Sequence, residues 1–295
     1  MKVTEGTIQQ LRSEGTFLYD MSMINHFISC PSSYHKRHEL GLMRNDLRLS
    51  TPLMFGSSVH RGIESWYAND KDDQQALEAF KLSFREHEEQ PKLGKTGKEL
   101  RAVYTLLFGC SLLTAYFNKY RGEVRTLMEN EIPVAEELTE GIYLAGRIDK
   151  VFEVSGKLVF QDHKTSKYYQ NFRLNPNGQF MNYKFLVQKL SGRKASGELD
   201  MLGVALNKGV NELLRREPFD YTEDQMREWR DSVVMWIKRM GSARELNQWP
   251  QSWNCEPYFK ECQFLPLCTL PVSSARENLV QSMYHVDFWD PFSVE

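Results

Sequence analysis

Three side chains in the middle of the chain have the types and spacing needed for hydrolysis. Asp149 is followed, after a short gap, by Asp162 and then by Lys164 in the tripeptide Asp-His-Lys. Mg²⁺ prefers hard oxygen ligands, and the two carboxylates with the backbone carbonyl of His163 would supply three. A metal-bound water is a strong nucleophile, and an adjacent ammonium could orient it or stabilise a phosphate transition state. The combination favours metal-dependent cleavage of a phosphodiester bond.

A hairpin of two strands would bring these side chains together. Residues 142–154 and 157–161 contain runs rich in Val, Leu, Phe and Tyr, as strands do, and the turn dipeptide Ser155-Gly156 separates them. Side chains two positions apart on a strand share a face, so Asp162 and Lys164 should point the same way. The histidine between them should point away and leave its carbonyl available. An isolated Asp-x-Lys is also common at solvated strand ends, so further motifs must decide.

Four motifs in this order resemble those of a known enzyme family. Residues 146–149 form Gly-x-x-Asp, residues 162–165 form Asp-x-Lys-Thr, and residues 179–183 form Gln-x-x-x-Tyr. Upstream, residues 55–64 contain His60 on an expected helix. The set resembles the PD-(D/E)xK nuclease superfamily in its RecB-like branch, and it covers roughly residues 20–270.

The resemblance implies a fold and an activity. The fold is α/β, with a restriction-endonuclease-like core of a central mixed sheet flanked by helices, a helical N-terminal part and a cysteine-rich C-terminal segment. The activity is that of a DNA nuclease, in particular an exonuclease, in which Asp149 and Asp162 hold Mg²⁺ or Mn²⁺ with the His163 carbonyl and Lys164 assists water attack. A catalytically inactive DNA-binding or assembly subunit is the alternative, and the intact Asp149, Asp162 and Lys164 argue against it.

His60 has two interpretations. A helix capped by Ser57 or Ser58 would place His60 and Glu64 one turn apart on the same face, as an ordinary surface pair. The family resemblance instead implies that His60 is a metal ligand, and an imidazole ligand would also suit Mn²⁺.

Gln179 and Tyr183 also lie one helical turn apart, on the helix expected over residues 178–191. In an ordinary amphipathic helix Tyr183 would be partly buried, while Phe180 and Leu186 face the core. The resemblance implies that Gln179 and Tyr183 lie near the active site and contact DNA or orient the catalytic residues.

Basic and aromatic residues next to these motifs are further candidates for DNA contacts. Lys167 and Tyr168 directly follow the catalytic strand, where a lysine could bind a phosphate and an aromatic ring could stack on a base. Residues 36–38 and Arg215-Arg216 are weaker candidates. Each could equally be a solvated charge or a packed side chain.

The five cysteines point to a second metal centre. Cys255, Cys262 and Cys268 are close in sequence, Cys30 lies far upstream, and Cys110 sits in an apolar run as a small core residue. The chain shows no signal peptide, so we expect a reducing cytoplasm, or the host cytoplasm for a phage protein, and no disulfides. The spacing lacks the close pairs of most zinc sites, and irregular spacing is compatible with an iron–sulfur cluster. Zinc and free thiols remain alternatives.

The family resemblance sharpens this expectation. AddB-type subunits and CRISPR adaptation nucleases place one cysteine before the nuclease core and three after it. Here Cys30-Pro31 and the segment 266–268 match that arrangement. The resemblance therefore implies that Cys30, Cys255, Cys262 and Cys268 hold a 4Fe–4S cluster.

The bulk properties fit one globular enzyme. The 295 residues are 41% apolar and 26% charged, and no apolar run approaches the roughly 20 residues needed to span a membrane. The net charge of −2 gives no indication that the surface as a whole binds DNA. A nuclease needs only a local basic groove to bind its substrate, however. We expect a single nuclease domain over 1–270 and a tail over 271–295 that packs on the body or docks a protein partner. Within this domain we expect a helical portion over 20–125, a nuclease core over 126–221, and a helix with the cluster-binding segment over 222–270.

The hydrophobic periodicity predicts the elements around the site. Thr222 and Gln225 form a capping box that opens a helix with apolar residues at helical spacing. The other expected helices cover 22–42, 57–68, 70–89, 99–120 and 178–191, and the expected strands cover 129–161, 199–206 and 212–221.

Overall fold

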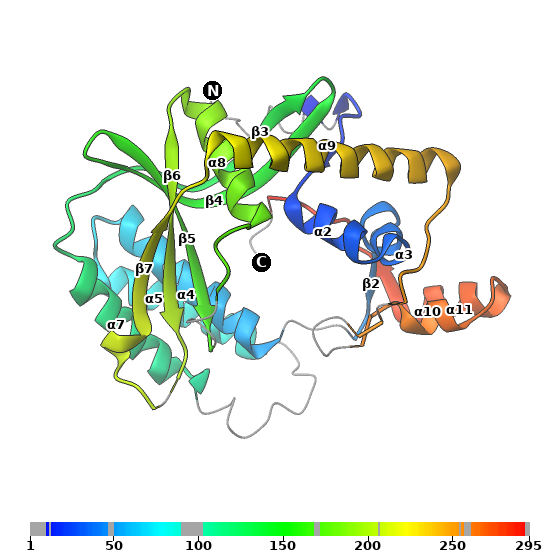
Figure 1. Ribbon diagram of the computed structural model, residues 1–295. Coiled ribbons are helices and arrows are strands. Elements are labelled where there is room, and N and C mark those ends of the chain that lie inside the picture. Colours follow the sequence, from blue (N-terminus) through cyan, green and yellow to red (C-terminus); the bar gives the residue numbers. More distant parts are fainter. Residues whose placement is uncertain are drawn as a thin grey trace.

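A six-stranded sheet of mixed direction lies at the centre of the molecule (Figure 1), in the order β1-β4-β5-β6-β7 with β3 paired to β4. The computed structural model describes residues 10–11, 13–46, 50–89, 103–167, 172–205, 207–253, 255–256 and 261–292. The strands are β1 (Leu18–Tyr19), β3 (Thr126–Thr139), β4 (Ile142–Val154), β5 (Lys157–Ser166), β6 (Ala195–Gly203) and β7 (Leu214–Phe219). Strands β3, β4 and β5 form an antiparallel meander, β6 runs parallel to β5, and β7 is antiparallel to β6.

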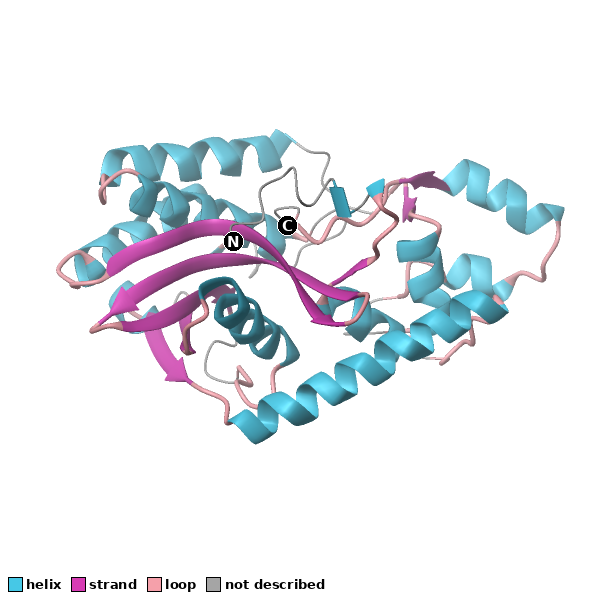
Figure 2. Ribbon diagram, turned by 90° about the horizontal axis from the view of Figure 1, so that it is seen from above, coloured by secondary structure: helices cyan, strands magenta, loops and turns pink. Residues whose placement is uncertain are grey.

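Helices cover both faces of this sheet. Helices α4 (Thr51–Ala68), α5 (Asp73–Glu89) and α7 (Leu106–Tyr120) lie on one face. Helices α8 (Gly178–Ser191) and α9 (Glu223–Leu246) lie on the other, as the view from above shows (Figure 2). Helix α8 connects the parallel strands β5 and β6. The expected α/β fold with a restriction-endonuclease-like core is confirmed.

Two of the expected helices begin where their caps predict. In α8 the Asn177 side chain accepts a hydrogen bond from the Phe180 backbone, and Gly192 ends the helix in the left-handed conformation with a φ of 68°. The capping box of Thr222 and Gln225 opens α9 as predicted. Of the α8 residues predicted to face the core, Phe180 and Leu186 are fully buried.

The continuous helix expected over 22–42 is wrong. The chain forms four short elements there: α2 (Met21–Ser29), α3 (Pro31–Tyr34), the π-helix η1 (His35–Glu39) and β2 (Leu42–Arg44). Pro31 has no N–H to continue the hydrogen-bond ladder, and it disfavours helical conformation at the preceding residue. Cys30 is accordingly extended, with φ −160° and ψ 105°.

Other expected boundaries shift by up to seven residues. Helix α4 begins at Thr51, so the predicted caps Ser57 and Ser58 lie inside it, and the Ser58 hydroxyl donates to the Met54 carbonyl one turn earlier. Helix α7 begins at Leu106 with Thr105 as its N-cap. The strand expected over 212–221 opens with the 3₁₀ turn η2 (Val210–Leu213) before β7.

The C-terminal residues pack on the N-terminal segment. Helices α10 (Leu265–Thr269) and α11 (Ser274–Met283) lead into β8 (Tyr284–Val286), which pairs antiparallel with β2. The Trp289 indole donates to Asp20 at 2.6 Å, and the Arg37 guanidinium donates to the Asp287 carbonyl at 2.6 Å. In the described part of the chain, no helix is long and apolar enough to cross a lipid bilayer.

Candidate active site

The predicted catalytic residues meet where β4 and β5 separate. The last paired residues are Lys150 and Gln161, and beyond them the two strands diverge. The Asp149 carboxylate bridges the opening by accepting a hydrogen bond from the backbone N–H of His163 at 2.8 Å. Asp149 and Asp162 thus lie on adjacent strands of a rigid sheet, and their backbones are fixed by hydrogen bonding.

Two glycines let helices approach this opening closely. At Gly56 of α4, a Cβ atom would lie 2.7 Å from the Thr165 hydroxyl of β5. At Gly146 of β4, it would lie 3.3 Å from both Leu186 and Tyr183 of α8. Larger residues at these positions would push α4 and α8 outward. The motif glycine Gly146 therefore has a packing role beside the chemistry.

Asp162 and Lys164 point the same way, as the strand alternation predicted. The Lys164 ammonium lies 3.1 Å from the Asp162 carboxylate. Burial raises the pKa of Asp162 to about 7, and the nearby charge of Asp149 adds to the rise while Lys164 opposes it. A carboxylate with so little solvation is ionised most easily when a cation lies against it.

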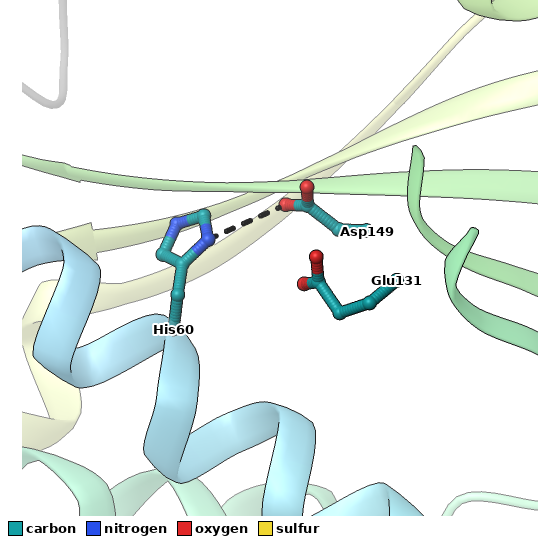
Figure 3. Close-up of side chains that lie close together, drawn as sticks. All are labelled: His60, Glu131 and Asp149. Carbon is teal, nitrogen blue, oxygen red and sulfur yellow. Dashed lines mark ion pairs between the residues drawn. The ribbon is translucent and has the colours of Figure 1, made fainter. Parts of the chain in front are cut away.

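His60 reaches the same place from α4. Its Nε2 lies 2.9 Å from the His163 carbonyl, which can only accept, so Nε2 carries the hydrogen. Burial lowers the pKa of His60, against the opposing charge of Asp149, so the neutral imidazole is favoured. Its unprotonated Nδ1 then faces the Asp149 carboxylate at 3.7 Å (Figure 3). The unprotonated His60 Nδ1 and the Asp149 carboxylate oxygen are both electron-rich, so a cation bound between them would be stabilised by both.

Glu131 is a site residue that the sequence analysis missed. Candidate ligand atoms of His60, Glu131 and Asp149 all lie within 4.8 Å of one another (Figure 3). Glu131 has a φ of 51°, an unfavourable backbone conformation for a residue with a side chain. Burial and the charge of Asp149 raise the pKa of Glu131, and Arg147 donates to its carboxylate at 2.8 Å. No motif marks this glutamate, and only the pairing of β3 with β4 brings it opposite Asp149.

Helix α8 contributes the predicted pair on the far side of the opening. The Gln179 amide donates to the Tyr183 hydroxyl at 2.9 Å. Tyr183 is buried, and its pKa is raised well above the usual value by burial and by the charges of Asp162 and Asp149. The Tyr183 ring packs against Gly146, three residues before Asp149 on β4. Of the residues after the catalytic strand, Lys167 is exposed and Tyr168 lies outside the described residues.

A buried polar network supports the strand from behind. The His163 imidazole lies between the Lys150 ammonium at 2.7 Å and the Asp200 carboxylate at 3.1 Å. Asp200 also accepts from the Tyr116 hydroxyl at 2.6 Å and faces the Arg216 guanidinium at 3.2 Å. Burial lowers the pKa of His163 to about 4, so the imidazole is neutral. Arg216 was a candidate for a DNA contact, but its side chain is only 7% exposed and serves this network instead.

Residues 36–38 have structural partners as well. The Lys36 ammonium donates to the Ser32 hydroxyl at 2.7 Å, and Arg37 is buried against Asp287. The ring of His38 stacks on Tyr34 with centroids 5.0 Å apart. This segment therefore packs beside Cys30.

Two segments that are far apart in sequence bring Cys30, Cys255, Cys262 and Cys268 into one region. The Cys262 N–H donates to the Cys255 carbonyl at 2.7 Å, and the Cys262 thiol lies 3.8 Å from the hydroxyl of Ser33, three residues after Cys30. Desolvation and the other three cysteines raise the pKa of Cys255. Four cysteines in one region form a donor set that suits a soft metal centre. Cys110 lies apart, on α7.

The comparisons with known proteins agree with this geometry. The family model described as "PD-(D/E)XK nuclease superfamily" matches residues 21–269. The crystal structure of a provisionally named exonuclease from Eubacterium rectale has a TM-score of 0.51 at 15% identity, covering 93% of this chain and 97% of that one. The structure of SSO0001 covers 85% of this chain and 96% of that one at 13% identity, with a TM-score of 0.33. No curated protein matches.

Proposed function

Because the chain belongs to the PD-(D/E)XK nuclease superfamily, we propose that it is a metal-dependent DNA nuclease that degrades DNA from its ends. The observation that carries the proposal is the meeting of Asp149, Asp162, Lys164 and His60 at the opening between β4 and β5. Action from DNA ends rests on the family resemblance and on the fold shared with the provisionally named exonuclease.

The donor set at the opening fits Mg²⁺ or Mn²⁺. Asp149 and Asp162 would supply oxygen ligands, and His60 would supply its unprotonated Nδ1. The His163 carbonyl, the third oxygen ligand expected from the sequence, accepts from His60 Nε2 and would have to exchange that bond for the ion. Glu131 adds a third carboxylate within reach of His60 and Asp149. When bound, a divalent ion generates a nucleophilic water at neutral pH and stabilises charge on the phosphate.

The remaining side chains have separate tasks in this proposal. Lys164 stabilises the ionised form of Asp162 and presents a positive charge to the attacked phosphate, because its side chain is 31% exposed beside a buried partner. The Tyr183 oxygen accepts from Gln179, so its own hydroxyl hydrogen is directed onward, toward the carboxylates or a DNA phosphate. Lys167 is an exposed cation directly after the catalytic strand and would bind the backbone of the substrate.

Cys30, Cys255, Cys262 and Cys268 would hold a 4Fe–4S cluster, with a structural zinc ion as the alternative. The cluster would tie α3 and the segment before α10 together and take no part in hydrolysis. Iron and acid-labile sulfide in the purified protein, with broad visible absorbance, would support the cluster. One zinc per chain without iron would favour the alternative.

The test of the proposed activity compares end-labelled linear DNA with covalently closed circles, each with Mg²⁺ or Mn²⁺. The expected result is loss of linear DNA only, with no loss in a chelator and none with Asp162→Asn. Cleavage of the circles would show an endonuclease. If wild-type protein with its metal centres loaded cleaves neither substrate, the proposal is wrong.

A further inference from the structure

A second basic region lies away from the active site. A cleft of about 680 Å³ is formed by the outer face of α9 and the end of β3. Figure 2 shows the end of the β3–β4 hairpin lying beside the long helix α9. We call this cleft the α9 groove. It is lined by Leu138 and Thr139 of β3 and by the α9 cations Arg227, Arg230, Lys238 and Arg239.

The charged side chains that line the α9 groove are mostly positive. Some exposed arginines elsewhere pair with carboxylates, as Arg121 does with Asp73 and Arg193 with Glu153. In the described part of the chain, no carboxylate pairs with Arg230, Lys238 or Arg239. Arg227 pairs with Asp224, and one further acid, Asp231, lines the groove. The groove therefore has a net positive charge in a chain whose overall charge is −2.

The spacing of these cations suits a row of phosphates. Arg230 and Lys238 are 238 − 230 = 8 residues apart, so their Cα atoms are separated by about 12 Å at 1.5 Å per helical residue. One strand of B-form DNA carries a phosphate about every 3.4 Å along the helix axis, so this distance spans three to four phosphates. The apolar side chains of Val234 and Met235 lie between the two cations in the groove lining, and Asp231 is the one acid between them.

We infer that the α9 groove binds the phosphate backbone of the nucleic acid substrate at a distance from the cleaved bond. This inference rests on the proposed nuclease function, and it deepens that function by adding a substrate-holding site. Sequence-independent phosphate contacts by arginine and lysine raise affinity and hold the substrate without affecting the chemical step.

The groove is within reach of the same DNA molecule. Thr139 lies 139 − 131 = 8 residues beyond Glu131 on β3, which corresponds to at most about 26 Å of strand. At about 3.4 Å per nucleotide, a substrate needs roughly eight nucleotides to touch both places. Shorter substrates would reach the active site alone.

The experiment measures DNA binding and cleavage by Arg230→Gln/Lys238→Gln. The matched control is Lys157→Gln/Lys194→Gln, which neutralises two exposed cations at the neighbouring ends of β5 and β6. Affinity for a fluorescent 30-nucleotide DNA is measured in a chelator at several salt concentrations. Each lost phosphate contact reduces the slope of log affinity against log salt by about 0.7 for single strands and about 0.9 for duplex.

The groove variant should therefore lower the slope by about 1.4 for single strands or about 1.8 for duplex, while the control leaves it unchanged. Cleavage of a six-nucleotide substrate should be equal in all three proteins, and KM for the 30-nucleotide substrate should rise in the groove variant alone. A slope equal to that of the control overturns the inference and favours a protein as occupant of the groove. Absence of DNA binding and cleavage in the wild type would instead refute the proposed nuclease function.

Discussion

The carboxylate site is built from adjacent strands and one helix, whereas the four cysteines come from segments that are 255 − 30 = 225 positions apart in the chain. At the carboxylate site, the pairing of β4 with β3 and of β5 with β6 holds the backbones on which Asp149 and Asp162 lie, and the buried network around His163 supports β5. In the part of the cysteine region that the structure describes, the elements next to the cysteines are short, such as α3 and α10, and β2 and β8 form a two-stranded sheet there.

Because of this difference, we expect the carboxylate site to determine activity and the cysteine region to determine the stability of the fold. The strands around Asp149 and Asp162 are held by many backbone hydrogen bonds, so a ligand can be removed without loss of the fold. The cysteine region has few such bonds and depends more on a cross-link. We therefore expect substitutions in the first region to abolish activity and substitutions in the second to lower stability.

The largest expected effect is on cleavage by Asp149→Asn. Loss of a metal-binding carboxylate removes several kcal/mol of transition-state stabilisation, and about 4 kcal/mol corresponds to a ~10³-fold lower rate. Single-turnover cleavage with saturating Mn²⁺ would measure this loss of rate, and the melting temperature would show whether the fold is intact. A near-normal rate would place the chemistry elsewhere.

Cys262→Ala should mainly lower the stability of the fold, whereas Asp149→Asn should mainly lower the rate of cleavage. Loss of one of the four thiolates should release the metal and lower the free energy of unfolding by about 2–4 kcal/mol, or roughly 3–6 °C in melting temperature. Cys110→Ala is the matched control, because Cys110 lies apart from the other four. Equal melting temperatures for the two variants would show that the cysteine region needs no cross-link.

The pH dependence of metal binding sharpens the comparison further. Because burial raises the pKa of Asp162 to about 7, the folded protein holds a proton there that the unfolded chain has released above pH 4. In the metal-free protein, this group therefore contributes a loss of stability as pH rises from about 4 to 7. Metal binding displaces the proton, so Mn²⁺ affinity should rise about fivefold from pH 6 to 7 and then level off. Calorimetry on wild type and Asp162→Asn checks this, and an identical pH slope in both would contradict it.

The smallest expected effect is that of Glu131→Gln. The substitution keeps the shape of the side chain but removes one charge near His60 and Asp149, so Mn²⁺ affinity should fall about tenfold or less. Glu129→Gln, two residues away on the same strand, is the control. Unchanged Mn²⁺ affinity in Glu131→Gln would show that the glutamate only positions Arg147.

The sequence allowed the fold class and the meeting of the motif residues to be predicted, because strand alternation and helix periodicity are local properties. Asp162 and Lys164 share a face for that reason, and Gln179 contacts Tyr183 for the same reason on a helix. Glu131 could not be found, since its place depends on the register of β3 against β4, which no local pattern fixes.

The same limit explains the other errors. Arg216 reads as an exposed basic residue in sequence, yet it is buried because Asp200 and Glu123 surround it from other elements. The apolar spacing over 22–42 predicts one helix, but Pro31 disfavours helical conformation at Cys30 and divides the segment there. The α9 groove likewise requires the position of the β3–β4 hairpin, which only the tertiary structure supplies.

The most direct measurement of the central claim is cleavage of 5′-labelled DNA by wild type and Asp162→Asn from parallel preparations, with Mn²⁺ added and then chelated. Melting temperature and iron content are measured on the same samples. The account predicts metal-dependent cleavage by the wild type alone, with equal melting temperatures and equal iron. Cleavage by Asp162→Asn at the wild-type rate would contradict the assignment of the active site to the opening between β4 and β5.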